Sequence, residues 1–387
     1  MQRANHLSSQ ALKAKPSPAI LSTQPRNPNW RESTSLIITA KDDHSSSDQQ
    51  FNYSVLMVKR SGGSSFMPST FVFPGGRVEL SDFDTKWYLL YAKYGLSPAT
   101  LDESIGRDIT GPRPPIVTSP LSAREVINSK QTILNPEIAL RITAIRETFE
   151  EAGVLLLTAP EERHQDCTPT QLSSADLSTW QLRVRNDGSS FFDLCDSLQM
   201  VPNIWHLHEW TNWLTPTNNH NKRYDTIFYM VCLPRRPDVV VDNAEVTMPM
   251  WTSPLSILEE HHKDQVFVAP PQVWEMSRML HFSHLDQLQH FALSRQRQGL
   301  ERWMPVVTAL NDGTLFFLPG DERYPEAPEM IANEPIPSLD STVEEQEAVS
   351  CKNLTVMRDG HFESVCTVEP ICGHKQPIRF SGTFTAQ

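Results

Sequence analysis

The sequence marks both ends of one helix. Asn135 is a good N-cap residue, Pro136 suits the first helical position, and Gly153 stands where a left-handed residue commonly ends a helix. At 3.6 residues per turn, the apolar side chains between them recur on one face, and three carboxylates fall on the opposite face within about 100° of arc. The helix is therefore expected to cover a core on one side and to present acid on the other. The apolar positions are Ile138, Ile142, Ile145 and Phe149.

The acidic face consists of Glu147, Glu150 and Glu151. Close carboxylates repel one another, and a helix stabilised by its own side chains would place Lys or Arg three or four positions from each of them. Only Arg146, four positions before Glu150, does so. A cation is therefore expected over this face, and Mg²⁺ or Mn²⁺ suits carboxylate oxygens and water. Considered alone, however, the helix is more simply explained as a solvated acidic surface.

The rest of the body mixes strands and helices. Runs of β-branched and apolar residues predict strands, and ordered structure is expected to begin near Ser35. One predicted strand runs into Pro74, Gly75 and Gly76, a loop that can bring backbone close to a ligand. An α/β fold is therefore predicted. Strands are expected at 36–38, 53–58, 71–73 and 226–233, an extended segment at 238–241 and a helix at 270–293.

Length and local composition predict one enlarged domain with additions. At 387 residues the chain exceeds an average domain, yet single α/β domains with insertions reach this size. Residues 83–135 are expected to be an insertion, because a short helix near 87–94 precedes the irregular Gly/Pro-rich stretch 111–115. An acidic, proline-rich tail with a hairpin at 355–368 is expected to follow the domain. The expected organisation is a leader at 1–34, a domain at 35–320 and a tail at 321–387.

Composition argues against several partners and structures. The formal net charge is −12, so a broad positive surface for duplex nucleic acid is not expected. No run approaches the roughly 18 to 20 apolar residues that cross a bilayer, so no membrane span is expected. The six cysteines form no CxxC pair, which indicates neither a zinc cluster nor a disulfide scaffold.

The two ends of the chain bear on its location. The first 31 residues contain basic but no acidic side chains, which suits either an organelle transit peptide or a plain disordered leader. The last three residues, 385–387, do not match the peroxisomal Ser-Lys-Leu type of signal.

A longer pattern connects the helix with the glycine loop. Gly76 is followed by Asp82 after five residues, and the stretch RETFEEAGV begins at Arg146. Together they resemble the box of the Nudix hydrolases, G-x5-E-x7-R-E-U-x-E-E-x-G-U, in which U is apolar. Three departures are plain: Asp82 replaces a Glu, Thr148 replaces an aliphatic residue, and residues 83–145, 63 in all, replace the usual seven.

A split box of this kind is itself a family feature, and the chain is similar to the Nudix hydrolase 19-type acyl-coenzyme A diphosphatases over most of residues 35–325. The resemblance implies an α/β Nudix fold, with a mixed sheet between helices and an insertion inside the box. It also implies hydrolysis of the diphosphate of coenzyme A or acyl-coenzyme A to 3',5'-ADP and (acyl-)4'-phosphopantetheine, with Mg²⁺ or Mn²⁺. The motifs that carry it are KR at 59–60, FMP at 66–68, FPGG at 73–76, WLTP at 213–216, RYDT at 223–226, AE at 244–245 followed by Trp251, PPQ at 270–272 and LPGDE at 318–322.

The resemblance also implies roles for the box residues. Glu147, Glu150 and Glu151 would hold the metal ion, with the backbone carbonyl of Gly75 as a further ligand. Arg146 would orient Glu150 rather than touch the substrate.

Hydrolysis also requires a general base. Glu147 and Glu245 both qualify. Glu245 lies six residues before Trp251, where related enzymes often bring in an acidic group from outside the box. The alternative for Glu245 is an ordinary loop carboxylate.

The substrate itself is implied by the family, because no spacing in the sequence reads out pantetheine. The signature R-x3-G-x3-F-P-G-G of some other coenzyme A Nudix enzymes is absent, since Ser65 and Ser69 occupy its Arg and Gly positions. Arg60, Lys59 and Arg223 are candidate contacts for the 3'-phosphate or the diphosphate, or else ordinary surface charges.

Several alternatives stay open from sequence. The substrate could be ADP-ribose, a dinucleotide or capped RNA, and an inactive Nudix-fold interaction module is a less favoured hypothesis. The family favours a peroxisomal location, the basic leader a mitochondrial one, and the missing C-terminal signal leaves the cytoplasm open. The sequence does not reveal the oligomeric state.

Overall fold

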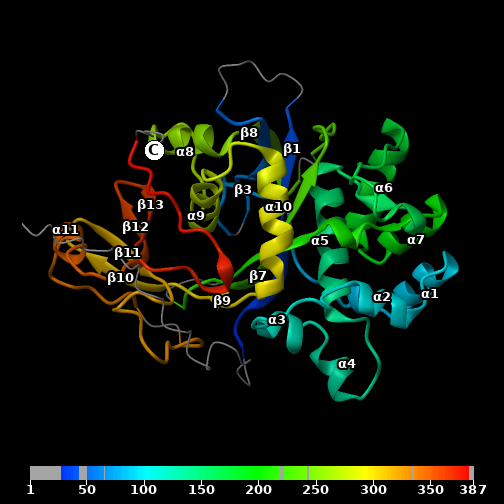
Figure 1. Ribbon diagram of the computed structural model, residues 1–387, viewed down its shortest axis with the longest axis horizontal. Helices are drawn as coiled ribbons and strands as arrows, with labels where there is room; N and C mark the ends of the chain where they lie inside the picture. The colour runs from blue at the N-terminus through cyan, green and yellow to red at the C-terminus, as the bar shows by residue number, and fades with distance from the viewer. Residues whose placement is uncertain are drawn as a thin grey trace, which may run out of the picture.

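A mixed seven-stranded sheet forms the centre of the structure (Figure 1). The computed structural model describes residues 28–42, 50–64, 66–217, 222–241, 244–332 and 335–382. The strand order is β3-β2-β1-β7-β6-β9, and β8 also pairs with β2. Since β1 runs parallel to β7 and antiparallel to β2, the predicted mixed sheet is confirmed. The strands are β1 Arg31–Lys41, β2 Tyr53–Arg60, β3 Phe71–Val72, β6 His208–Leu214, β7 Tyr224–Leu233, β8 Val246–Thr252 and β9 Arg302–Trp303.

Helices cover both faces of this sheet. Successive side chains of a strand point to opposite faces. Leu36 and Ile38 of β1 accordingly pack in one apolar cluster with Ile142 of α5. Ile37, between them, packs in a second cluster with Trp274 of α9. The helices are α5 Pro136–Ala152 on the first face and α8 Pro254–His262, α9 Pro270–Met279 and α10 Leu285–Arg295 on the second.

The insertion inside the box packs against the N-terminal end of α5. Arg113 donates hydrogen bonds to Glu209 of β6 at 2.6 and 2.7 Å, and another to Glu137 in the first turn of α5. Leu121 donates its backbone N–H to Glu32 of β1 at 2.7 Å. The insertion is therefore fastened to the end of α5 that lies away from the acidic residues. The 3-10 helix η2 Leu80–Phe83 leads into the insertion, and its helices are α1 Lys86–Lys93, α2 Pro98–Ser104, α3 Pro115–Thr118 and α4 Arg124–Asn128.

A second helical pair lies beside the C-terminal end of α5. Helices α6 Ser174–Asn186 and α7 Ser190–Leu198 connect two short paired strands, β4 Leu157–Thr158 and β5 Val201–Pro202. The ring of Phe192 in α7 meets the ring of Trp87 in α1 with centroids 5.2 Å apart. This pair thus joins the insertion to the acidic end of the helix.

The C-terminal part of the chain forms a four-stranded antiparallel sheet, which Figure 1 shows in orange and red beside the main sheet. The predicted hairpin corresponds to β12 and β13. It pairs with β11, which lies before residue 320, so the sheet crosses the expected boundary between domain and tail. Asp321 fixes this crossing, because its carboxylate accepts the N–H of Asn353 at 2.9 Å. The elements are β10 Val306–Leu310, β11 Gly313–Phe317, α11 Val343–Gln346, β12 Asn353–Arg358 and β13 His361–Cys366.

Two expectations about the elements need correction. The helix expected at 270–293 is two helices, because Asn52 accepts the N–H of Leu285 and so caps the second of them. The first strand begins at Arg31, which pairs with Tyr224, and not near residue 35. Residues 238–241, expected to be an extended segment, lie outside the helices and strands. The part of the expected leader before residue 28 lies outside the described residues.

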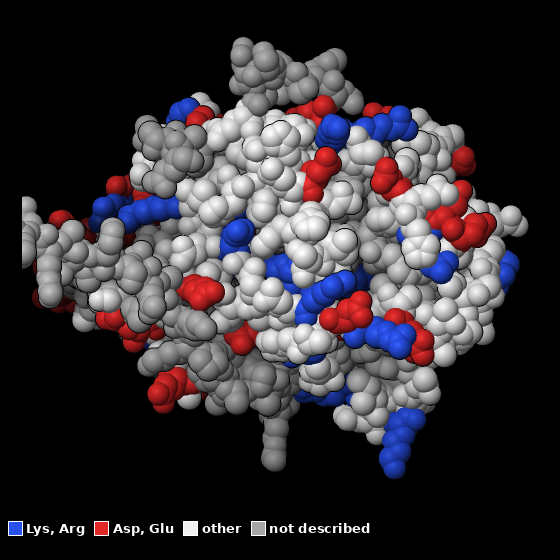
Figure 2. Space-filling model, viewed as in Figure 1, with Lys and Arg blue, Asp and Glu red and all other residues white. Residues whose placement is uncertain are grey.

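The surface carries mixed charge. Figure 2 shows basic and acidic side chains interspersed over the face in view. Within the described ranges, no helix combines the length and the apolar character needed to cross a bilayer.

Candidate active site

Both predicted ends of the acidic helix are present in α5. The side chain of Asn135 accepts the N–H of Glu137 at 3.0 Å, and Pro136 follows as the first helical residue. Gly153 ends the helix in a left-handed conformation with φ of 68°, and its N–H bonds to the carbonyl of Phe149. The helix therefore places its acidic residues in its last two turns, just before it ends at Gly153.

Arg146 is the buried centre of the acidic group, with 1% of its surface exposed. Its guanidinium donates to Asp82 at 2.9 and 2.8 Å, to Glu147 at 2.9 Å and to Glu150 at 2.7 Å. A further bond at 2.9 Å goes to the carbonyl of Arg77. All of these contacts are internal, so Arg146 orients carboxylates and does not itself face a ligand.

Asp82 stands where the box usually has its first Glu, and it is also buried. Besides the bonds from Arg146, it accepts the hydroxyl of Thr143 at 2.8 Å and the N–H of Glu79 at 2.9 Å. The shorter side chain therefore serves to hold Arg146 and the start of the insertion on the helix.

The glycine loop comes close to two of the helix acids. The N–H of Gly75 donates to Glu151 at 2.9 Å. A Cβ atom on Gly75 would lie 2.2 Å from the carbonyl oxygen of Thr34, and one on Gly76 would lie 2.1 Å from a carboxylate oxygen of Glu147. At Gly75 the clash is with backbone, so only glycine fits there, whereas at Gly76 a larger residue would have to push the carboxylate of Glu147 aside.

Burial disfavours the charged forms of the helix acids. It raises the pKa of Glu147 to about 8, and the neighbouring charge of Glu150 adds to the effect against the attraction of Arg146. Burial also raises the pKa of Glu151 well above its ordinary value, with contributions from the charges of Glu147 and Glu245. A divalent cation would reverse this destabilisation, so the donor set suits one.

The three carboxylates of the helix do not form a closed set of metal ligands in this arrangement. Among the described residues, no three acidic, His or Cys side chains converge closely enough to hold one. Glu147 and Glu150 are turned toward Arg146, and Glu151 toward Gly75. Mg²⁺ commonly keeps several waters and takes only one or two carboxylates together with substrate phosphates, so it does not need a preformed cage.

Glu245 approaches this group from outside the helix. It is exposed, its backbone carbonyl accepts the N–H of Ser61 at 2.8 Å, and its charge raises the pKa of Glu151. The sequence places Glu245 in a loop between strands, and the structure brings that loop beside the helix acids.

Sequence reasoning missed another acidic residue, Glu79. Burial is the largest cause of the raised pKa of Glu150, and among the neighbouring carboxylates Glu79 contributes most to it. The loop between α6 and α7 meets it, since a Cβ on Gly188 would lie 2.3 Å from its carboxylate. Its position three residues after Gly76, within the glycine loop, was the available signal.

The three basic residues predicted to contact substrate separate in the structure. Arg60 lies near the acids, because its charge lowers the pKa of Glu151 against the effect of burial. Its guanidinium is held at 2.9 Å from the hydroxyl of Ser64 and 3.1 Å from the carbonyl of Phe66. The structure therefore supports Arg60 as a cation beside the acidic face.

Lys59 and Arg223 are placed elsewhere. Strand alternation puts Lys59 on the other face of β2, where its ammonium lies 5.8 Å from the ring centroid of Phe71. Arg223 is 2% exposed, and it donates to the carbonyls of Thr215 at 2.9 Å and Met330 at 2.6 Å. The structure does not bring either one to the acidic face, because both are engaged in packing within the fold.

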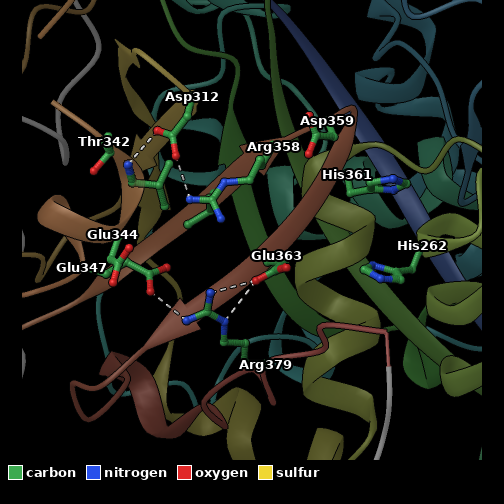
Figure 3. A pocket seen from close by; sticks show the side chains of 12 residues that line it. His262, Asp312, Thr342, Glu344, Glu347, Arg358, Asp359, His361, Glu363 and Arg379 are labelled. Carbon is green, nitrogen blue, oxygen red and sulfur yellow. Dashed lines mark hydrogen bonds and ion pairs between the residues drawn. The ribbon is translucent and has the colours of Figure 1, made fainter. Parts of the chain in front are cut away.

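A cavity of about 510 Å³ lies at the C-terminal sheet. Figure 3 shows Arg379 between Glu347 and Glu363, which it contacts at 3.0 and 2.9 Å. Arg358 pairs with Asp312 in the same cavity at 3.0 Å. Since carboxylates pair with both guanidinium groups, neither Arg358 nor Arg379 is available to bind an anionic substrate.

Comparison with known proteins gives consistent matches. The NUDT19 Nudix domain matches residues 30–279, and the NUDT19 C-terminal domain matches residues 307–367. The chain is 35% identical to a Xenopus laevis protein named acyl-coenzyme A diphosphatase NUDT19, over 88% of this chain and 90% of that one. Proteins of the same name from Gallus gallus and Homo sapiens are 38% and 32% identical, over 83% and 92% of this chain and 87% and 96% of theirs. A solved NUDIX hydrolase from Alicyclobacillus acidocaldarius is 19% identical with a TM-score of 0.47, covering 67% of this chain and 96% of that one.

Proposed function

Because this chain belongs to the NUDT19 family of Nudix proteins, we propose that it hydrolyses the diphosphate of coenzyme A and acyl-coenzyme A. The products are 3',5'-ADP and (acyl-)4'-phosphopantetheine. The resemblance drawn from the split box, and the α/β Nudix fold that it implied, are confirmed. The observation that carries the proposal is the complete acidic helix in a chain whose relatives bear the name acyl-coenzyme A diphosphatase.

The reaction depends on a divalent metal ion, as is general for Nudix hydrolases. We assign Mg²⁺ or Mn²⁺ to this site. Glu147, Glu150 and Glu151 hold it, with the carbonyl of Gly75. A bound divalent ion neutralises phosphate charge and lowers the pKa of a coordinated water. The raised pKa values of the three carboxylates, which persist despite the nearby charges of Arg146 and Arg60, support this assignment.

The protein's own groups have distinct roles in this proposal. Arg146 fixes the orientation of Glu147 and Glu150 through its hydrogen bonds. Glu245 acts as the general base, because it is exposed near Glu151, whereas Glu147 is buried against Arg146. Arg60 contacts the diphosphate or the 3'-phosphate.

The test is a substrate panel with the purified full chain, with and without Mg²⁺. Coenzyme A, an acyl-coenzyme A, ADP-ribose, a dinucleotide and capped RNA are compared by product mass. The proposal expects 3',5'-ADP from the first two, only with metal. A preference of tenfold or more for a substrate without pantetheine would replace coenzyme A as the assigned substrate.

A pair of variants tests the site itself. Glu150→Gln removes one charge from the acidic face and is expected to abolish metal-dependent turnover while the fold stays intact. Glu161→Gln removes a charge from an exposed residue of the 3-10 helix at 160–162 and is the matched control. Unchanged turnover in a folded Glu150→Gln protein would overturn the site assignment.

A further inference from the structure

Strand pairing brings two exposed arginines, Arg31 and Arg77, to one face of the sheet. Arg77 follows the glycine loop and pairs with Ser33 of β1 in an antiparallel bridge. Residues directly opposite in such a bridge point to the same face, and so do residues two positions apart on a strand, as Arg31 and Ser33 are. The two arginines are therefore diagonal neighbours, roughly 7 to 8 Å apart, which long side chains can span.

These two cations have no counter-charge beside them. Within the described part of the chain, neither guanidinium forms an ion pair or a hydrogen bond. Like charges at neighbouring positions of a sheet repel each other, so an anion is expected between Arg31 and Arg77. A phosphate suits best, because the planar fork of a guanidinium matches its oxygens.

A pair of hydroxyl groups lies on the same face. Ser33 is hydrogen-bonded to Thr226 of β7, with 2.6 Å between the two oxygens. Either hydroxyl can be the donor, and the one that accepts still has an O–H to give. The face thus offers a neutral donor to a phosphate as well as two charges.

Two aromatic rings border this face. Tyr224 of β7 is the partner of Arg31 in the parallel register, so its side chain points the same way. Its ring meets the ring of Phe66 with centroids 5.3 Å apart and planes at 66°. Both side chains are half-buried, so part of each ring is exposed. Phe66 and Tyr224 belong to the FMP and RYDT motifs, which the metal site does not use.

Arg77 also adjoins the acidic group. Its backbone carbonyl accepts a hydrogen bond from Arg146 at 2.9 Å. A Cβ on the preceding residue, Gly76, would lie 2.1 Å from the carboxylate of Glu147. In coenzyme A the 3'-phosphate and the diphosphate are carried by the same ribose, so their binding sites must be neighbours. The position of Arg77 meets this requirement.

We propose that this face binds the nucleotide half of the substrate: Arg31 and Arg77 hold the 3'-phosphate, and the rings of Phe66 and Tyr224 stack on the adenine base. The inference rests on the proposed function, whose substrate it places, and it leaves Arg60 for the diphosphate. Aromatic rings stack on any base, so the two arginines supply the selectivity for a nucleotide with a 3'-phosphate.

The test compares 3',5'-ADP with 5'-AMP, which lacks only the 3'-phosphate. Calorimetric titration of the full chain gives both dissociation constants without turnover. The wild type is expected to prefer 3',5'-ADP by about 100-fold, and Arg31→Gln or Arg77→Gln to reduce this preference to about 10-fold, because each removes a charged hydrogen bond. The matched control is Arg235→Gln, an exposed arginine just beyond the other end of β7, which should keep the wild-type preference.

Turnover gives a second measurement. Coenzyme A and 3'-dephospho-coenzyme A differ in the same phosphate, so the ratio of their KM values should shift by the same factor in each arginine variant. Equal affinity of the wild type for 3',5'-ADP and 5'-AMP, or a wild-type preference in both arginine variants, would overturn the phosphate assignment.

The base is tested separately. Tyr224→Leu is expected to weaken 3',5'-ADP and 5'-AMP alike by about 10-fold, whereas Tyr224→Phe keeps the ring and the affinity. If Tyr224→Leu does not fold, Phe66→Leu tests the other ring. Wild-type affinity in the leucine variant would overturn the stacking.

Failure of the proposed function has a different signature. A chain that does not hydrolyse coenzyme A, but prefers 3',5'-ADP through Arg31 and Arg77, refutes the reaction and keeps the nucleotide site. A chain that hydrolyses coenzyme A with the same KM ratio in the wild type and both arginine variants keeps the reaction and refutes the inference.

Discussion

Arg146 and Asp82 form a two-pronged ion pair, at 2.9 and 2.8 Å, although the residues are 64 positions apart in the chain. Both side chains are 1% exposed. The pair connects the two halves of the box across the insertion, because it joins Asp82, which follows the glycine loop, to the helix that carries the acidic residues. The same guanidinium orients Glu147 and Glu150, so the closure of the box and the geometry of the site depend on one group.

Asp82→Asn is expected to lower both stability and activity. It leaves the buried charge of Arg146 without its main partner, which costs about 3 kcal/mol in the free energy of unfolding. Turnover falls as well, because Arg146 can then turn further toward Glu150. Urea unfolding and a rate assay measure the two effects. Asp312→Asn, which breaks the exposed pair with Arg358, is the control and is expected to cost at most about 1 kcal/mol. Equal unfolding midpoints for the two variants would contradict this role.

Local patterns were sufficient to predict the helix. Asn135, Pro136 and Gly153 lie at its ends as expected, because capping depends on the residues immediately around it. The separation of Lys59 from Arg60 was also within reach of the sequence, since neighbours on a strand point to opposite faces. Alternation alone does not say which of the two residues points toward the acidic helix. It identified Arg60 only once the structure showed which face of β2 lies toward that helix.

Other features depend on contacts between distant segments. Arg223 looked like a free cation, but Met330 and Thr215 supply its partners from far along the chain and from the neighbouring strand. Gln181 lies in a polar helix with no motif, yet its amide donates to the carbonyl of Phe149 at the end of α5 and to that of Val240, which meets the same end of the helix. No local periodicity of the sequence encodes these contacts between distant segments, so only the folded structure reveals them.

Gly76→Ala is expected to impair the site while keeping the fold. The added Cβ would lie 2.1 Å from a carboxylate oxygen of Glu147, so that side chain must move away from its present place. A displacement of about 1 Å at a catalytic site can cost about 100-fold in rate, and weaker Mn²⁺ binding accompanies it. Calorimetric titration with Mn²⁺ and a rate assay test this. Gly63→Ala, where the nearest atom would be 3.8 Å away, is the control. Wild-type Mn²⁺ affinity in Gly76→Ala would count against the placement of the metal.

His208 is expected to make stability depend on pH. Burial, with smaller effects of His206 and Arg141, lowers the pKa of His208 from 6.5 to about 4 in the folded protein. As the pH falls below 6.5, the unfolded chain takes up a proton at this imidazole while the folded protein does not until about pH 4. The free energy of unfolding therefore decreases over this window, by about 3 kcal/mol for this group.

The measurement is urea unfolding at several pH values between about 4 and 7, the window of the expected loss. His208→Gln should flatten the dependence by up to one proton in slope, because the variant has no imidazole to titrate. The exposed His164→Gln is the control. A slope unchanged in His208→Gln would show that the imidazole is already protonated in the folded protein.

Arg113→Leu tests what the insertion contributes. Arg113 connects the insertion to Glu209 and Glu137, and Glu137 lies 13 residues before Glu150 on the same helix, or about 20 Å along its axis. Removing this half-buried cation leaves two carboxylates with Arg141 alone, so a loss of about 3 kcal/mol in the free energy of unfolding is expected. KM for acyl-coenzyme A and kcat should stay within about twofold of the wild type, because the contacts lie far from the acidic face. A large rise in KM with little loss of stability would instead assign the insertion to substrate recognition.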